Sequence, residues 1–443
     1  MKKSVARLRR RLLDVHSAKL LVAGYALYMA IGWVMLCLPI SQQLPVSGLD
    51  NLFIAVSAVS TTGLVTIDPG TSYSGFGQFV ILALIQIGGL GYMTLTSFII
   101  LTAVNPRSKL SLKLTRSSFS LPDNFEVRDF LRRILIYTLV AELLGAVALY
   151  FLFLDRGVDA PMWSALFHSI SAFCTAGFSL NATSFEGFVA DTPVSLVIAG
   201  LSYAGGIGFL VVHDGWRVLS GQQTELGFTS RIVIRMTLLM AVVGTILFLL
   251  VSSWPADMSG WERLLASFFQ AMTAQTTVGF NTVPIGALAL PAIMVIYLLM
   301  IFGASPAGTG GGLKITTLAV LIGIVRSVSR QRQTVTFMRR EIPEQVRTTA
   351  ISACALYVLI LGTALFLLSL TERIGLEQLL FEALSALGTV GLSMGATGQL
   401  SELGKLIVIF LMFAGRVGFV TLGIATAGRD ERDYQAADDP FVI

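Results

Sequence analysis

The chain contains few of the residues from which catalytic and metal sites are built. Its 443 residues include only three histidines and three cysteines. The histidines, at 16, 168 and 213, are too far apart in the sequence to indicate a shared metal site, and the cysteines form no disulfide or metal-binding pattern. No Gly-x-Ser-x-Gly or His-Glu-x-x-His motif is present, which argues against an enzyme.

Charge is scarce as well. Only 13% of the residues are charged while 54% are hydrophobic, and the segments 20–40, 79–104 and 291–302 hold almost no charge. A helix of about 20 apolar residues crosses the ~30 Å hydrocarbon core of a bilayer. The sequence therefore predicts an all-α polytopic membrane protein. No small-residue cleavage site follows the first apolar run, which argues against a cleavable signal peptide.

The few charges are distributed by sign. Basic residues gather in segments 1–19, 105–133 and 326–347, whereas the other connections carry mainly acidic residues. Because basic connections stay on the cytoplasmic side of a membrane, both termini are expected in the cytoplasm. This topology explains the net charge of +5, which does not indicate a nucleic-acid partner.

One short pattern occurs four times, at intervals of roughly a hundred residues. When Gly63, Gly177, Gly279 and Gly391 are superposed, phenylalanine stands ten residues earlier in every copy, alanine five earlier and threonine two earlier. A serine or threonine stands six residues earlier, and a large apolar residue follows each glycine. Five matched columns indicate four copies of one structural unit.

Each copy lies between two apolar segments. The predicted spans are 20–40 and 76–103, 134–154 and 193–219, 232–253 and 290–326, and 348–370 and 402–427. The segments 49–60, 161–173, 261–274 and 376–387 are too short to cross and predict re-entrant pore helices. The expected fold has four membrane–pore–membrane repeats, with eight spans and four pore helices around a pseudo-fourfold central pore.

The predicted units follow from these spans. They are a basic cytoplasmic N-terminus (1–19), repeat 1 (20–104), a linker with repeat 2 (105–219), a linker with repeat 3 (220–326), a linker with repeat 4 (327–427) and a cytoplasmic tail (428–443).

The Thr-x-Gly turns are the candidate site. Irregular backbone at membrane depth is tolerated only where protein buries it or water reaches it, which indicates an internal polar axis. Rings of carbonyl and hydroxyl oxygens replace the water around a monovalent cation. No ring of acidic residues accompanies the turns, which argues against a filter for divalent cations. The alternative is that the small residues only pack helices together. The candidate filter residues are Thr61, Thr62, Gly63, Leu64, Thr175, Ala176, Gly177, Phe178, Thr277, Val278, Gly279, Phe280, Thr389, Val390, Gly391 and Leu392.

Several stretches of the chain resemble one family. The segments IQIGGLGYMT (85–94), LFHSISAFCTAGFSL (166–180), GFNT (279–282), FEALSALGTVGLSMG (381–395) and AGRVGF (414–419) look like the Trk/Ktr/HKT superfamily of potassium transporters. The resemblance covers almost the whole chain and is greatest to the Ktr membrane subunit.

The resemblance implies a function and partners. It implies selective K⁺ uptake, often Na⁺-dependent, across the bacterial cytoplasmic membrane, with K⁺ bound at the candidate filter residues. It also implies a homodimer docked on a cytoplasmic RCK ring that binds ATP and ADP, and no organic cofactor on this chain.

In plant relatives a serine at the first filter glycine goes with Na⁺ selectivity, so Gly63 favours K⁺. A Na⁺ or poorly selective transporter of the same superfamily is the alternative. Thr62, Ala176, Val278 and Val390 differ from one another, so strict fourfold symmetry is not expected.

A second unusual stretch interrupts the predicted span at 290–326. Five glycines and a proline in ten residues cannot form a stable helix, and no G-K-[ST] of a phosphate-binding loop is present. The resemblance implies an intramembrane gating loop below the filter, and the alternative is a passive kink. The candidate gate residues are Gly303, Ala304, Ser305, Pro306, Ala307, Gly308, Thr309, Gly310, Gly311, Gly312, Lys314 and Arg416.

Three charges lie within predicted spans or at the loop. Arg416 is expected to face the interior and bind carbonyl oxygens, because a charge in hydrocarbon costs about 2.5–3.5 kcal/mol. The resemblance implies that it limits ion passage below the filter, and a structural anchor is the alternative. Lys314 either acts as a tethered cation or extends toward the membrane interface. Glu142 is either the buried partner of an arginine or a polar contact between repeats, and direct ion binding is the less favoured alternative.

Overall fold

The computed structural model describes residues 17–91 and 127–426. The described chain is mostly helical, and its sheet is a single two-stranded antiparallel hairpin. In this hairpin β1 (Thr336–Phe337) pairs with β2 (Arg340–Glu341), with Thr336 opposite Glu341. The predicted N-terminus, the end of the span at 76–103, most of the connection at 105–133 and the tail at 428–443 lie outside the described residues, apart from residues 17–19 and 127–133.

Four successive segments contain the same sequence of elements, a helix, a short helix and a second helix, and in the second, third and fourth segments the second helix is interrupted. The first segment comprises α2 (Ser17–Leu36), α3 (Gly48–Ser60), the one-turn α4 (Pro69–Ser72) and α5 (Gly75–Leu90). The second comprises α8 (Val127–Asp155), α9 (Pro161–Phe173), α10 (Thr192–Gly206) and α11 (Phe209–Leu219). The third comprises α12 (Phe228–Val251), α13 (Gly260–Thr276), α14 (Leu290–Ile301) and α15 (Ile315–Ser329). The fourth comprises α16 (Glu344–Thr371), α17 (Leu376–Gly388), α18 (Glu402–Val417) and α19 (Phe419–Thr426). Short 3-10 turns η1 (Pro39–Ser41), η3 (Glu186–Phe188), η4 (Ile285–Ala287) and η5 (Thr397–Gln399) lie in the connections.

Three of the described helices, α8, α12 and α16, are each long and apolar enough to cross a membrane, and the number rises to five when each bent helix pair is counted as one span. Large apolar side chains remain exposed along these helices, such as Leu143 on α8 and Val358 on α16. A bilayer rather than water suits such surfaces. The count of eight spans stays a prediction.

Two of the predicted spans are broken rather than continuous. The helices α10 and α11, predicted as one span at 193–219, meet at an angle of 91°, and α18 and α19, predicted as one span at 402–427, meet at 100°. Gly208 and Gly418 lie at the breaks with φ of 94° and 90°. Such angles end an α-helix and are accessible mainly to glycine. In the sequence these glycines look like ordinary small residues within a straight span, whereas in the structure the chain changes direction at each of them.

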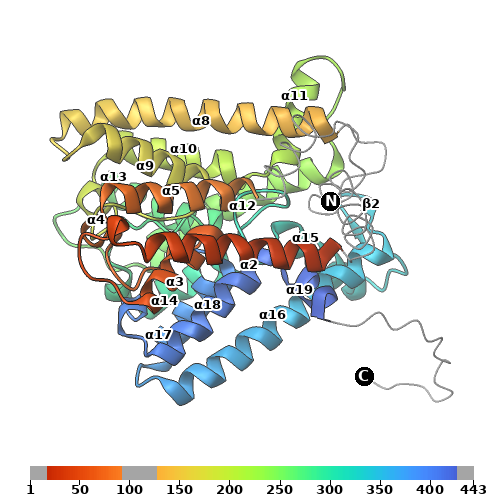
Figure 1. Ribbon diagram of the computed structural model, residues 1–443. Helices are drawn as coiled ribbons and strands as arrows, with labels where there is room; N and C mark the ends of the chain where they lie inside the picture. The colour runs from red at the N-terminus through yellow and green to blue at the C-terminus, as the bar shows by residue number, and fades with distance from the viewer. Residues whose placement is uncertain (1–16, 92–126, 427–443) are drawn as a thin grey trace, which may run out of the picture.

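The short helices form the centre of the molecule. Figure 1 shows the long helices α8 and α16 on opposite flanks, with α9, α3 and α17 between them. The repeated phenylalanines of the sequence pattern are all at most 1% exposed: Phe53, Phe167, Phe269 and Phe381. These rings anchor each short helix in the core, because burying a phenylalanine contributes about 1.5–3 kcal/mol.

Local sequence signals set where the short helices begin. Pro161 occupies the first turn of α9, where its missing N–H is not needed. The helix α13 begins with a capping box, in which the Ser259 hydroxyl accepts the N–H of Glu262 and the Glu262 carboxylate accepts the N–H of Ser259. These hydrogen bonds hold the pKa of the exposed Glu262 carboxyl below its ordinary value.

An ion pair joins the first and fourth segments. The Lys405 ammonium donates to Asp50 Oδ1 at 2.6 Å, and the side chains are 17% and 14% exposed. Asp50 lies in the first turn of α3 and Lys405 in the first turn of α18. Because these residues are 355 positions apart in the chain, the pair ties the beginning of the described chain to its end.

We expect Lys405→Met to lower the melting temperature of the purified protein in detergent. The substitution leaves a partly buried carboxylate without its charged donor, which costs about 1.5–3 kcal/mol. Arg373→Met is the control, because Arg373 is exposed and none of the ion pairs recorded within residues 17–91 and 127–426 includes it. Equal melting temperatures for the two variants would show that the pair contributes nothing to the fold.

Candidate functional site

Each short helix ends at one of the Thr-x-Gly turns. The helices α3, α9, α13 and α17 end one or two residues before the threonine. All four threonines adopt the left-handed backbone conformation, with φ between 49° and 59°: Thr61, Thr175, Thr277 and Thr389. A β-branched residue rarely adopts these angles, which cost about 1–3 kcal/mol each. Strain repeated at four equivalent places persists only where the surrounding structure enforces it, and such strain is typical of functional sites.

The glycines of the four turns form a closed ring. Their φ angles lie between 67° and 93°. A Cβ atom on any of them would overlap the carbonyl oxygen of the central residue in the next turn. The overlaps run in one direction around the ring: Gly63 with Ala176, Gly177 with Val278, Gly279 with Val390, and Gly391 with Thr62. The structure therefore brings all four turns together, at a spacing that excludes any side chain from the glycine positions.

The hydroxyl residues six positions before the glycines support the turns from behind. In three of the four copies the hydroxyl bonds to the turn backbone: Gly63 N donates to Ser57 Oγ at 3.1 Å, Gly391 N donates to Ser385 Oγ at 3.1 Å, and Ser171 Oγ donates to Phe178 O at 2.8 Å. The apolar residues after the glycines are at most 1% exposed: Leu64, Phe178, Phe280 and Leu392. Their side chains thus act as anchors in the core, and only their backbone is available to a pore.

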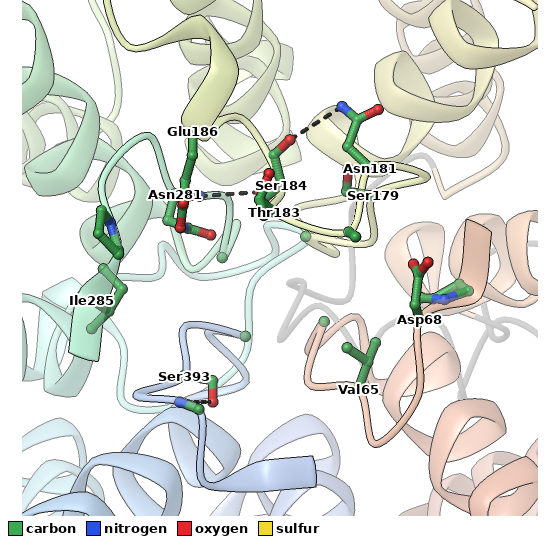
Figure 2. A pocket seen from close by; sticks show the side chains of 18 of the residues that line it. Val65, Asp68, Ser179, Asn181, Thr183, Ser184, Glu186, Asn281, Ile285 and Ser393 are labelled. Carbon is green, nitrogen blue, oxygen red and sulfur yellow. Dashed lines mark hydrogen bonds between the residues drawn. The ribbon is translucent and has the colours of Figure 1, made fainter. Parts of the chain in front are cut away.

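The ring opens into a cavity of about 510 Å³, which all four glycines line. Figure 2 shows the segments that follow the turns arranged around this cavity, and these segments contribute Asp68 and Glu186. The Glu186 carboxylate accepts a hydrogen bond from Asn281 Nδ2 at 2.8 Å, so two of these segments are joined at the cavity wall. Carboxylates around a concave mouth attract cations.

The glycine-rich loop lies against the threonines of the ring, whereas the glycines and the residues after them line the cavity. It contacts every one of the four threonines: Thr61 Oγ1 donates to Thr309 O at 3.2 Å, Thr175 Oγ1 lies 2.9 Å from Thr309 Oγ1, Gly311 N donates to Thr389 Oγ1 at 2.9 Å, and a Cβ on Gly310 would overlap Thr277 Oγ1. The loop therefore closes the side of the ring that faces away from the cavity.

Backbone contacts hold the rest of the loop in place. The N–H of Phe209 donates to Ala307 O at 2.9 Å, and the N–H of Thr309 donates to Gly205 O at 3.3 Å, so the second segment holds the middle of the loop. The N–H of Gly312 donates to Gly415 O at 3.3 Å in the fourth segment. Ala304, Ser305, Pro306 and Gly308 lie in the same loop, and Ala304 O accepts the N–H of Ile315 at 2.8 Å as the next helix begins.

Arg416 lies beside the ring, and its recorded partners are uncharged oxygens. Its guanidinium donates to Thr309 O and to Gly88 O, and also to Thr61 Oγ1 at 2.9 Å. It thereby joins the loop, the first turn and α5. Among the residues that the structure describes, no carboxylate pairs with this cation, so its positive charge stays uncompensated next to the threonines.

Lys314, Glu142 and His168 also have defined hydrogen-bonding partners. The Lys314 ammonium turns back onto the loop and donates to Gly310 O at 2.7 Å. Gln86 Nε2 donates to Glu142 Oε2 at 3.2 Å, which makes Glu142 a polar contact between the first and second segments. His168 is fully buried and hydrogen-bonded through both ring nitrogens, as a packed side chain rather than a metal ligand.

A second column of glycines was not recognised from the sequence. In each segment one glycine of the second helix, or of its continuation, lies so close to the last turn of the short helix that a Cβ would overlap a carbonyl oxygen there. The contacts are Gly88 with Val59, Gly205 with Phe173, Gly303 with Gln275, and Gly415 with Leu387. Each carbonyl lies two residues before the threonine. Each glycine of this column follows the turn glycine of its own segment by 24 to 28 residues. Because this spacing differs between the segments, the column does not line up when the four copies are aligned without gaps on their turn glycines.

We expect Gly391→Ala to destabilise the protein far more than Gly395→Ala. Both glycines have positive φ, of 91° and 86°, but only Gly391 lies against a neighbouring carbonyl, whereas nothing lies within 4 Å of a Cβ at Gly395. The backbone cost of about 1–2 kcal/mol is common to both variants, so the difference in melting temperature isolates the ring contact. Equal losses would mean that the ring tolerates a side chain.

The close approach of the second glycine column to the short helices can be tested with two glycines of α10. Gly200→Ala places a methyl group in open space and is expected to stabilise the helix by roughly 0.5–1 kcal/mol. Gly205→Ala, on the same helix, forces a methyl group into the carbonyl oxygen of Phe173. We therefore expect opposite shifts in melting temperature, and a stabilising Gly205→Ala would contradict the close approach.

The chain matches the TrkH family model, described as a cation transport protein, over residues 27–433. It is 37% identical to the Ktr system potassium uptake protein B of Vibrio alginolyticus, over 89% of this chain and 88% of that protein. It is 35% identical to the protein of the same name from Bacillus subtilis, over 95% of both chains. It is 31% identical to the potassium/sodium uptake protein NtpJ of Enterococcus hirae, over 99% of this chain and 98% of that one.

The fold has a solved counterpart as well. The crystal structure of the potassium transporter TrkH from Vibrio parahaemolyticus superposes with a TM-score of 0.74 at 19% identity, over 95% of this chain and 85% of that one. At this identity the likeness concerns the fold alone, and it agrees with the helical membrane protein expected from composition. The family model and the relatives together show that this chain belongs to the TrkH family of cation transport proteins.

Proposed function

We propose that this chain is the pore-forming subunit of a potassium uptake system of the bacterial cytoplasmic membrane. The observation that carries the proposal is the ring of four Thr-x-Gly turns, in which each glycine lies against the central carbonyl of its neighbour. Two of the relatives are named potassium uptake proteins. A closed ring of backbone oxygens is the arrangement that substitutes for the hydration shell of K⁺.

The route of the ion follows from this geometry. A cation enters the outer cavity, where Asp68 and Glu186 raise its local concentration, and loses water at the ring of turns. The four left-handed threonines place carbonyl and hydroxyl oxygens along its path. The inner side of the ring is closed by the loop 303–312, which acts as the gate.

Two positive charges support the gate assignment. Arg416 and Lys314 both bind backbone oxygens of the loop, at Thr309 and Gly310. In this closed arrangement they hold positive charge where a K⁺ ion leaves the filter, and they occupy carbonyl oxygens that the ion could otherwise use. Opening requires the loop to move away from the threonines and to release these donors.

Regulation comes from other subunits. The chain acts as a homodimer on a cytoplasmic RCK ring that binds ATP or ADP, as the family resemblance implies, and Na⁺ activates transport. Transport is the only activity assigned to the chain, which is not an enzyme. The second candidate function is Na⁺ or poorly selective cation transport, since one relative is named a potassium/sodium uptake protein.

The filter is tested by cation flux into proteoliposomes that contain the purified chain. We expect K⁺ flux to exceed Na⁺ flux, and Gly63→Ser to remove at least about ten-fold of this preference, equivalent to ~1.4 kcal/mol. The added side chain would overlap the carbonyl oxygen of Ala176. The control is Gly395→Ser, which has a similar φ but open space. Equal K⁺ and Na⁺ fluxes through the unmodified chain, unchanged by Gly63→Ser, would rule out the filter and favour the second function.

The gate is tested in the same vesicles. Arg416→Gln keeps a hydrogen-bond donor near Thr309 but removes the charge, so we expect K⁺ flux to rise while the preference for K⁺ is retained. A reduced flux from a well-folded variant would instead make Arg416 a structural anchor.

A further inference from the structure

One position on the short helices differs in all four copies. It lies nine residues before each turn glycine and directly after the repeated phenylalanine, and its occupants are Ile54, His168, Gln270 and Glu382. All four side chains are fully buried. Because the residue types differ, the position is not one of the matched columns of the repeat.

Glu382 binds the segment that follows the fourth turn. Its carboxylate accepts hydrogen bonds from four donors: Ser393 Oγ at 2.7 Å, Met394 N at 3.0 Å, Ala396 N at 3.3 Å and Thr397 Oγ1 at 2.5 Å. Ser393 and Gly391 both line the outer cavity. The carboxylate thus holds the chain immediately outside the turn against the short helix α17.

His168 and Gln270 make the same connection with fewer bonds. His168 Nε2 lies 3.0 Å from Ser179 Oγ and accepts the N–H of Leu180 at 3.3 Å. Gln270 Nε2 donates to Thr282 Oγ1 at 3.3 Å, while its buried Oε1 has no hydrogen-bond partner among the described residues. Ser179 and Thr282 follow their turn glycines by two and three residues.

The first segment cannot make this connection. Ile54 occupies the position on α3, and Val65 stands two residues after Gly63, where Ser179 and Ser393 stand in the second and fourth segments. Neither side chain forms hydrogen bonds. The support decreases from four bonds in the fourth segment to two, one and none in the second, third and first.

We propose that this position holds the outer end of the filter to the short helices, and that Glu382 is its principal positioning residue and a determinant of cation selectivity. Oxygens held at a fixed spacing favour the cation that fits them, and four hydrogen bonds to one side chain hold the adjoining segment more firmly than two, one or none. The fourth turn is therefore the best supported and the first the most compliant. The inference rests on the proposed function, since it concerns the same filter.

The test measures K⁺ and Na⁺ fluxes in proteoliposomes for substitutions on both sides of the contact. Glu382→Leu leaves four donors without an acceptor and is expected to reduce the K⁺/Na⁺ flux ratio about ten-fold, equivalent to ~1.4 kcal/mol. Glu382→Gln keeps an oxygen that accepts from Ser393 and the two N–H groups, and its amide can donate to Thr397. We expect this conservative variant to retain nearly the original ratio.

Two further variants separate positioning from other effects. Glu377→Gln removes a carboxylate from an exposed position of the same helix and should leave the ratio unchanged. Ser393→Ala with Thr397→Val removes the partner hydroxyls without touching Glu382, and should reduce the ratio by itself but cause no additional loss in the Glu382→Leu background. If Glu382→Leu does not yield folded protein, the flux ratio of the Ser393→Ala, Thr397→Val double variant tests the inference by itself.

The outcomes distinguish the two proposals. A monodisperse Glu382→Leu protein with the original flux ratio would overturn the inference while leaving the filter assignment intact. A loss of selectivity in Glu382→Gln as large as in Glu382→Leu would also overturn it, because the buried charge rather than the positioning would then be responsible. Absence of K⁺ preference in the unmodified chain would remove the proposed function, and this inference with it.

Discussion

The structure depends on one steric constraint, the contact between each turn glycine and the central carbonyl of the next turn. Four such contacts close a ring from Gly63 through Gly177 and Gly279 to Gly391 and back to Thr62. The left-handed threonines are held in strained conformations by this ring. The second glycine column, from Gly88 to Gly415, lets the flanking helices approach closely enough to keep the ring together.

The loop at 303–312 and Arg416 are adjusted to this ring. The hydroxyls of the threonines provide hydrogen-bonding partners on the side that the loop closes, and the single residue Thr309 contacts both the first and the second turn. Arg416 then connects Thr309 to the oxygen of Gly88. A movement of the loop is therefore coupled to hydrogen bonds of the turn threonines and to α5, which gives the candidate gate a direct physical link to the candidate filter.

The four copies share a backbone but not a set of supporting side chains. The hydroxyl six residues before the glycine bonds to the turn in three copies, and in the third copy the Thr273 hydroxyl is buried without a partner among the described residues. The position of Glu382 shows the same inequality. Because these supporting groups lie behind the turns and are not part of the ring itself, each copy is free to use different chemistry there.

Much of the architecture could be predicted from the residues alone, because its signals are local. Apolar runs, basic connections and the repeated Phe, Ala, Thr and Gly columns indicate the helices and the four turns, and the range 161–173 matches α9 at both ends. The corners at Gly208 and Gly418 could not be predicted, because a glycine in an apolar run is compatible with a straight span as well as with a break. The partners of Arg416, Lys314 and Glu382 also required the fold. Hydrogen bonds such as that from Arg416 to Thr61 join residues 355 positions apart, and only the packing of four segments around one axis brings such residues within reach of one another.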